Sequence, residues 1–317
     1  MQEGVVIKST GSWYSVQLES GERIESRIIG RFRMDGKKLT NPVAVGDRVL
    51  LEMEQGESNT GIIKEILPRT NYVVRQSPRK KHELHLLASN VDQAIVIITI
   101  SNPKLKQGFI DRFLLMTEPY DIHTIIVANK ADLYSDGDLA VFEYLKEIYE
   151  AIGYQMILTS AEDGTGVETL KALMHGKTNL VAGQSGVGKS SLVNRIKPGL
   201  QLRTSALSDY TGKGQHTTTF AEMFNLDDGG KIIDTPGIKT LGFNHLETMD
   251  VAHNFREFFH LSSECRFGGK CLHREEPGCA VKSALENEEV SELRYINYLA
   301  LLEEVEDQNY WERNSDF

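Results

Sequence analysis

The chain has 317 residues, of which 40% are hydrophobic and 25% charged, and its formal net charge is −10. This length is too great for one small core and predicts two or three domains. No apolar run approaches the ~18 residues needed to cross a bilayer, which argues against a membrane protein. The acidic, polar start has no basic segment before an apolar core, so we expect no signal peptide and a soluble chain in the cytoplasm. We also expect a monomer.

Acidic residues are concentrated near the C-terminal end. Residues 282–317 contain ten acidic and three basic residues, so this segment supplies −7 of the net charge and the other 281 residues only −3. The overall negative charge therefore does not argue against nucleic-acid binding elsewhere in the chain. A solvated helix face is the simplest account of the acidic segment, and a basic protein partner is the alternative.

Residues 1–75 have the pattern of a small β domain. Five short runs of strand-forming residues are separated by Gly, Asn, Pro and Asp turns at the spacing of a barrel. The runs span residues 5–8, 13–18, 23–27, 47–52 and 61–67. Five strands predict an OB-fold β-barrel, whose surface commonly binds nucleic acid.

Several side chains of this domain are candidates for RNA contact. Five basic residues fall in one stretch: Arg27, Arg31, Arg33, Lys37 and Lys38. Trp13 and Tyr14 could offer faces on which bases stack. A solvated strand edge with Trp13 in the core is the alternative. The basic segment 72–87 is predicted to be a linker, which would gain phosphate contacts beside RNA.

From residue 76 to residue 244, apolar runs alternate with segments of helical spacing. The continuous apolar run at 92–100 is typical of a buried strand, and helical spacing follows at 110–116, 139–151 and 167–174. This alternation predicts a parallel sheet covered by helices on both faces.

One apolar run ends in the sequence N-K-A-D at residues 129–132. The Asp132 carboxylate can accept hydrogen bonds from N1–H and N2–H₂ of guanine. Adenine lacks this pair of donors, so a site built for it rejects adenine. Asn129 would join neighbouring loops, and the Lys130 stem could lie across the base. The motif predicts a guanine site.

A glycine-rich turn follows the apolar run at 179–182 and leads into helical spacing at 190–196. The turn matches G-x-x-x-x-G-K-[ST] and makes nine residues candidate nucleotide contacts: Gly183, Gln184, Ser185, Gly186, Val187, Gly188, Lys189, Ser190 and Ser191. Its backbone N–H groups can point at phosphate oxygens, assisted by the positive end of the helix. Lys189 could act on the β- and γ-phosphates, and Ser190 could bind Mg²⁺. A plain glycine-rich connection is the alternative.

Two further segments fit the same site. Residues 232–237, I-I-D-T-P-G, are an apolar strand followed by a turn, in which Asp234 could hold Mg²⁺ through water and the Gly237 amide could sense a γ-phosphate. Ser160 and Ala161 follow another apolar run and resemble the loop that supports the base in GTPases.

The catalytic group is less clearly marked. Ile238 stands where ordinary GTPases carry the glutamine that orients water, and an apolar side chain cannot hydrogen-bond that water. His216 is the candidate replacement, with an exposed loop histidine or a group from a partner as alternatives. Thr218 beside it is the expected Mg²⁺-binding switch threonine, with Thr217 and Thr219 as alternatives.

The three cysteines of the chain lie within 15 residues, around one histidine. The cluster consists of Cys265, Cys271, His273 and Cys279. Three thiolates and an imidazole form a closed tetrahedral shell, typical of one structural Zn²⁺. An odd cysteine number argues against disulfides. His260 is assigned to a helix at 250–261 and not to this shell.

Residues 245–317 around this cluster are predicted to form a helical domain. Apolar residues keep helical spacing from 284 to 305. So small a module buries little core, and a metal would stabilise it.

The order of the nucleotide motifs is unusual. The N-K-A-D motif and Ser160–Ala161 precede the phosphate loop, whereas they follow it in Ras-like GTPases. All these loops would lie at strand C-terminal ends of one sheet, so a circular permutation preserves the site. This order, with a small β domain ahead and a Cys/His cluster behind, resembles the RsgA (YjeQ) family of GTPases for small-ribosomal-subunit biogenesis.

The resemblance covers essentially the whole chain. It implies a multidomain protein: an N-terminal OB-fold β-barrel that binds RNA, a central α/β circularly permuted P-loop GTPase, and a C-terminal zinc-binding α-helical module. It also implies hydrolysis of GTP to GDP with Mg²⁺, stimulated by the small ribosomal subunit, whose rRNA it contacts during late assembly. The alternatives are a nucleic-acid-binding module with little turnover, or a GTPase acting on another RNA or on the large subunit.

Overall fold

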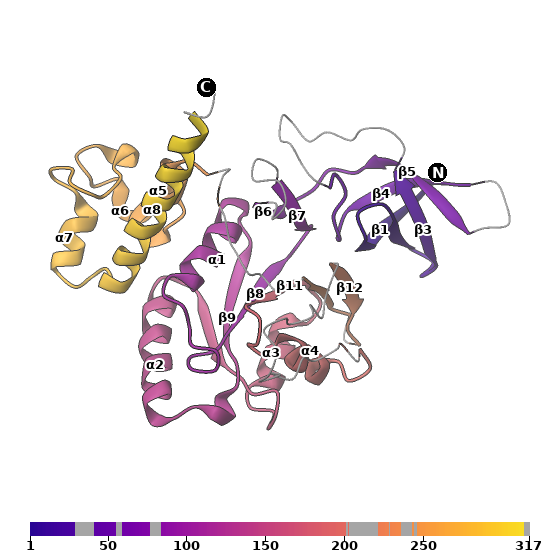
Figure 1. Ribbon diagram of the computed structural model, residues 1–317, viewed down its shortest axis with the longest axis horizontal. Helices are drawn as coiled ribbons and strands as arrows, with labels where there is room; N and C mark the ends of the chain where they lie inside the picture. Colours follow the sequence, from indigo (N-terminus) through magenta and orange to yellow (C-terminus); the bar gives the residue numbers. More distant parts are fainter. Residues whose placement is uncertain are drawn as a thin grey trace.

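The computed structural model describes residues 1–28, 41–54, 59–76, 84–200, 202, 221–227, 229–235, 243 and 246–313. A β-barrel, a central α/β domain and a helical module follow one another along the chain (Figure 1). In Figure 1 the barrel and the helical module lie on opposite sides of the central domain. None of the helices within these described ranges has the length and apolar character needed to span a membrane.

The five strands predicted for residues 1–75 are confirmed. They are β1 (Gln2–Ser9), β2 (Tyr14–Leu18), β3 (Arg23–Ile28), β4 (Arg48–Met53) and β5 (Thr60–Ile66). Their order is β1-β2-β3-β5-β4, and β4 pairs back onto β1, which closes the barrel. Side chains that alternate along the strands fill its interior, among them Val16, Ile24 and Ile63, each 0% exposed. This is the predicted OB-fold.

The prediction of a linker is wrong in part, because this segment contains two paired strands. β6 (Tyr72–Gln76) and β7 (Leu84–Ser89) form an antiparallel ribbon that crosses the domain boundary expected at residue 76. Val73, Val74 and Leu86 are buried in it. The basic composition of this stretch obscured the apolar side chains that hold the ribbon in place.

The central sheet has the order β10-β9-β8-β11-β13-β12. Its strands are β8 (Gln93–Ile98), β9 (His123–Ala128), β10 (Gln155–Leu158), β11 (Thr178–Gly183), β12 (Glu222–Asn225) and β13 (Lys231–Asp234). All are parallel to their neighbours except β12, which is antiparallel to β13. The parallel sheet was predicted, but β12 was not, because its four residues carry little apolar pattern.

Helices cover both faces of this sheet, as predicted. They are α1 (Phe109–Thr117), α2 (Asp136–Ala151), α3 (Val167–Met174) and α4 (Lys189–Ile196), with short 3₁₀ turns η1 (Glu118–Tyr120) and η2 (Ala131–Leu133). One face of β8 and β9 packs in a core with α1 and α2, and the other in a separate core with α3 and α4. Successive residues of β8, such as Val96 and Ile97, therefore belong to different cores.

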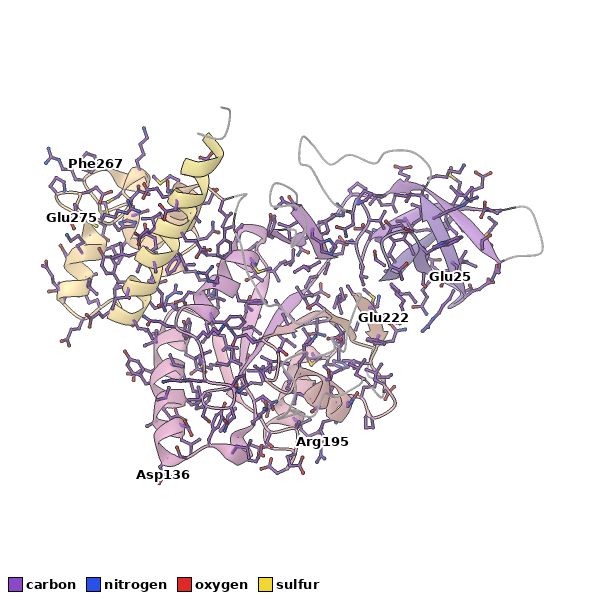
Figure 2. All side chains as sticks on the ribbon, viewed as in Figure 1. Glu25, Asp136, Arg195, Glu222, Phe267 and Glu275 are labelled. Atoms are coloured by element: carbon purple, nitrogen blue, oxygen red, sulfur yellow. The ribbon has the colours of Figure 1, made fainter. Side chains whose placement is uncertain are left out.

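The barrel is attached to the central sheet through β12. Lys8 of β1 pairs with Glu222 of β12 in an antiparallel bridge, and their side chains form a 2.9 Å ion pair. Figure 2 labels Glu222 at this junction. Within the described ranges the two domains thus share one continuous sheet of eleven strands.

The C-terminal module consists of α5 (Thr248–His253), α6 (Arg256–Ser262), η3 (Gly268–Lys270), α7 (Ala280–Glu286) and α8 (Glu292–Arg313). The prediction of a single helix at 250–261 is wrong, because Phe255 adopts an extended conformation between α5 and α6. The continuous helix predicted from 284 to 305 is also wrong. Glu288 has a left-handed φ of 62° and separates α7 from α8. At both breaks, apolar residues before and after the turn face the same core. Their spacing in the sequence therefore resembles that of one continuous helix.

Candidate functional site

Four of the predicted motif loops, together with the loop after β8, meet at one edge of the central sheet. Because β8, β9, β10, β11 and β13 are parallel, their C-terminal ends share that edge. The loops that follow them begin at Thr99, Asn129, Thr159, Gln184 and Thr235. Segments far apart in the sequence are therefore brought to one place.

The glycine-rich turn has the backbone that a phosphate loop requires. Gly186 and Gly188 have left-handed φ angles of 88° and 85°, and α4 begins directly afterwards. A Cβ atom on Gly188 would lie 2.5 Å from Nδ2 of Asn129, and one on Gly183 would lie 2.6 Å from the Ile97 carbonyl oxygen. Close packing therefore requires a glycine at both positions, and at Gly188 the left-handed conformation requires it as well.

Lys189 and Asp234 lie side by side beneath this turn. Nζ of Lys189 is 2.5 Å from Oδ1 of Asp234 and also donates to the carbonyl oxygen of Thr235. The two side chains are 9% and 1% exposed. A cation and a carboxylate meet here at the start of α4, together with the half-buried hydroxyl-bearing residue Ser190.

Asn129 connects three of the loops. Its Nδ2 donates to the Val187 carbonyl oxygen in the phosphate loop at 2.9 Å, and its Oδ1 accepts from the Thr159 hydroxyl at 3.2 Å. Asn129 is 0% exposed. The joining role predicted for this side chain is thus seen in its hydrogen bonds.

The rest of the N-K-A-D motif is held from two sides. Ser160 Oγ donates to Oδ1 of Asp132 at 2.6 Å, and itself accepts from the backbone N–H groups of Glu162 and Asp163. Asp132 is exposed, so its carboxylate is accessible at the edge where the loops meet. The Lys130 ammonium donates to the carbonyl oxygen of Asn102 at 2.8 Å, and burial lowers its pKa.

The predicted Cys/His cluster forms in the C-terminal module. The ligand atoms of Cys265, Cys271, His273 and Cys279 all lie within 4.8 Å of one another, and all four residues are buried. Nδ1 of His273 is 3.7 Å from Sγ of Cys265 and 3.4 Å from Sγ of Cys279. A tetrahedral Zn²⁺ centre, with bonds of about 2.3 Å to sulfur and about 2.0 Å to nitrogen, separates such ligands by about 3.5 Å. The four residues fit a zinc ion.

Surrounding residues fix the cluster. Tyr295 and Tyr298 of α8 donate hydroxyl hydrogen bonds of 2.7 Å to the carbonyl oxygens of His273 and Leu272. Glu276 accepts from the backbone N–H groups of Leu272 and Arg274. His260 lies on α6 and outside the cluster, as predicted.

Comparison with known proteins identifies the family. The family model for the RsgA GTPase matches residues 66–244, and the model for the RsgA N-terminal domain matches residues 3–63. The chain belongs to the RsgA family of GTPases. Its circular permutation, read from the order of the motifs, is thereby confirmed, and it is an enzyme that hydrolyses GTP.

Relatives cover nearly the whole chain. The small ribosomal subunit biogenesis GTPase RsgA of Christiangramia forsetii is 48% identical over 309 residues, which are 97% of this chain and 98% of that protein. The protein named RsgA 2 of Bacteroides thetaiotaomicron is 46% identical over 308 residues, with the same coverage.

Two solved structures have the same fold along almost their full length. YjeQ from Thermotoga maritima has a TM-score of 0.75 and 37% identity, over 96% of this chain and 98% of that one. YloQ, described as a circularly permuted GTPase, has a TM-score of 0.72 and 34% identity, over 97% and 96%.

The structure of this RsgA-family GTPase adds residues that the motifs did not reveal. Tyr134 and Asn102 both contact the N-K-A-D loop, and Thr159 contacts Asn129. Tyr134 lies only two residues beyond Asp132, but a tyrosine at that place carries no motif signal. Asn102 and Thr159 become neighbours of the motif only through the parallel pairing of β8, β9 and β10.

Some predicted residues lie outside the described residues. They are Gly237, His216, Thr218 with its alternatives Thr217 and Thr219, Ile238, and the basic residues Arg31, Arg33, Lys37 and Lys38. Ser191, Gln184 and Ala161 are described: Ser191 is exposed, and the other two are half-buried, on the expected loops.

The barrel offers a different aromatic surface from the one predicted. Trp13 is 43% exposed, so the alternative that placed it in the core is wrong. Tyr14 is 1% exposed and cannot stack on a base. Arg27 is half exposed and paired with Glu54 at 2.6 Å. Strand alternation explains the difference, because adjacent side chains point to opposite faces.

Proposed function

We propose that this protein hydrolyses GTP to time its attachment to the small ribosomal subunit during late assembly. Its relatives carry the name small ribosomal subunit biogenesis GTPase, which supports that partner. The observation that carries the proposal is the Asn129 side chain, which ties the Asp132 loop to the phosphate loop of Lys189. A nucleotide can therefore be held at its base and at its phosphates by one connected structure.

In this proposal the base is read by the N-K-A-D loop. The Asp132 carboxylate accepts from guanine N1–H and N2–H₂, while Ser160 holds that carboxylate in place. Lys130 covers the base with its stem, and Ala161 lines the supporting loop. Asn129 keeps these groups in register with the phosphate loop.

The phosphates are bound by residues 183–191. Lys189 turns its ammonium group toward the β- and γ-phosphates, and backbone N–H groups of the loop complete the cradle. Ser190 and Asp234 are hard oxygen donors suited to Mg²⁺, which would neutralise developing charge on the phosphates when bound. We assign Thr218 and the Gly237 amide to the γ-phosphate side of the site, on the sequence alone.

The water-orienting group is assigned to His216 or to the ribosomal partner, since Ile238 cannot serve. Because the apolar Ile238 cannot orient the attacking water, we expect hydrolysis to be slow in the free protein and faster on the subunit. His216→Ala tests this assignment: full subunit-stimulated turnover in the variant would clear His216 of the role.

The flanking domains serve attachment. We propose that residues 1–75 bind rRNA, with exposed Trp13 as a stacking face, and that residues 245–317 carry one structural zinc ion. Residues 76–244 form the GTPase unit. The protein acts as a monomer in the cytoplasm, where ribosomal subunits assemble.

Phosphate release measured with and without purified small subunits tests the proposal. We expect stimulation by the small subunit and none by the large subunit, with Lys189→Ala as the inactive control. Co-sedimentation with separated subunits in a non-hydrolysable GTP analogue should show the same preference. Equal binding to both subunits, or turnover that neither subunit changes, would contradict the ribosomal role.

A further inference from the structure

Tyr134 closes the loop that carries the guanine motif. Its hydroxyl donates to the carbonyl oxygen of Asn129 at 2.8 Å and accepts from the backbone N–H of Ile100 at 2.9 Å. Asn129 is the first residue of the motif, and Tyr134 follows its last residue by two. The hydroxyl therefore fixes both ends of the motif to each other and to the end of β8.

The motif between these ends has a backbone that needs such support. Lys130 has a left-handed φ of 68°, a conformation that side-chain-bearing residues adopt only when their surroundings enforce it. The next N–H, that of Ala131, donates to the Thr159 carbonyl oxygen at 3.0 Å. Tyr134 completes this set of restraints from the opposite end.

The residues after β8 connect Tyr134 to the rest of the site. Thr99 Oγ1 donates to the Pro103 carbonyl oxygen at 2.6 Å, and Asn102 accepts from Lys130. Pro103 lies against Gly186 of the phosphate loop, where a Cβ atom would be 3.7 Å from its Cδ. One loop thus touches both the base motif and the phosphate loop, and Ile100 anchors it to Tyr134.

We propose that Tyr134 is a positioning residue for guanine recognition, whose hydroxyl sets where the Asp132 carboxylate meets the base. This inference rests on the proposed guanine site. Burial raises the pKa of the Tyr134 phenol to about 12, so the hydroxyl keeps its proton at neutral pH and continues to donate. Tyr134 itself touches neither phosphates nor the attacking water in this role.

Tyr134→Phe removes the hydroxyl and keeps the ring. The Asn129 carbonyl and the Ile100 N–H lose a partner, and the motif loosens around Asp132. We expect the dissociation constants of GTP and GDP, measured by calorimetry, to rise roughly tenfold. Affinity for ATP should fall much less than affinity for GTP, because adenine lacks the donor pair that Asp132 reads. Turnover at saturating GTP with small subunits should stay near the wild-type value.

Tyr144→Phe on α2 is the matched control, because Tyr144 is 55% exposed. It should bind GTP as the wild type does. Tyr134→Phe with unchanged GTP affinity, with lower turnover at unchanged affinity, or with equal losses for GTP and ATP would overturn the inference.

Asp132→Ala, measured in parallel, separates this inference from the proposed site. If Asp132→Ala weakens GTP binding while Tyr134→Phe does not, only the role of Tyr134 is wrong. If Asp132→Ala binds GTP as tightly as the wild type, or the wild type binds ATP as well as GTP, the guanine site itself is wrong and the inference falls with it.

Discussion

Asp111 of α1 and Arg294 of α8 form an ion pair inside the protein, with Oδ1 2.5 Å from Nη1 and exposures of 0% and 2%. Tyr149 and Asn297 also donate to the Asp111 carboxylate, while Glu257 accepts from Nε and Nη2 of Arg294. The C-terminal module is thereby anchored to a helix of the GTPase domain by a buried hydrogen-bonded network.

Removing one partner of this pair should be costly. Arg294→Met leaves the Asp111 carboxylate buried without its cation, and we expect the free energy of unfolding to fall by about 3–5 kcal/mol. Urea denaturation with hydrogen exchange of α8 measures the change. Arg274→Met is the control, because Arg274 and Glu306 form a more exposed pair, expected to contribute less than about 1 kcal/mol. Equal losses in the two variants would contradict the argument.

The geometry of the Cys/His cluster predicts that replacing His273, but not His260, causes loss of zinc. His273→Ala should reduce the zinc content of the purified protein from about one ion per chain, measured by mass spectrometry, because a three-ligand shell binds the ion more weakly. Hydrogen exchange of residues 265–286 should rise at the same time. His260→Ala should retain the metal, since His260 lies outside the cluster. Zinc retained in both variants would argue against this coordination.

We predict that alanine at Gly188 weakens GTP binding and that alanine at Gly176 does not, although the two glycines have similar backbone conformations. Gly188 and Gly176 have φ angles of 85° and 67°, so an alanine at either position should cost on the order of 1 kcal/mol in unfolding free energy. Only at Gly188 would the new Cβ meet Asn129, whereas nothing lies within 4 Å at Gly176. Gly188→Ala should therefore weaken GTP binding at least ~10-fold, equivalent to about 1.4 kcal/mol. Gly176→Ala with a similar loss of affinity would show backbone strain alone to be responsible.

Because the C-terminal module is anchored to the GTPase domain, we predict that its hydrogen exchange depends on the bound nucleotide. The chain after Asp234 leads directly into the C-terminal module. Loss of the γ-phosphate should therefore change the conformation of that module. Hydrogen exchange of residues 245–317 should differ between the GDP and GTP-analogue states. Because Arg112 of α1 is ion-paired with Glu304, we expect α8 to be among the affected elements. Identical protection in both states would exclude this transmission.

The acidic C-terminal segment is partly explained by these contacts. Glu304 pairs with Arg112, and Glu306 lies 2.8 Å from Arg274. Two of the acidic residues thus serve attachment within the molecule and not only solvation, which the charge count of the sequence could not distinguish.

Local patterns were sufficient for most elements of the fold. The five barrel strands and helices α1 to α4 were predicted because each has a clear apolar period. The prediction failed for elements in which that period is short or continues across a turn. β12 is four residues long, and the breaks at Phe255 and Glu288 preserve a helical period across a turn.

The sequence by itself determined the chemistry of the site: N-K-A-D, the glycine-rich turn and the Cys/His cluster are local patterns whose residue types dictate what they can bind. Only the tertiary structure decided which side chains hold these groups in place. Tyr134 to Ile100, Asn129 to Val187 and Asp111 to Arg294 are contacts made by strand pairing and helix packing. Such contacts join residues with no fixed separation in the chain, so no local pattern encodes them.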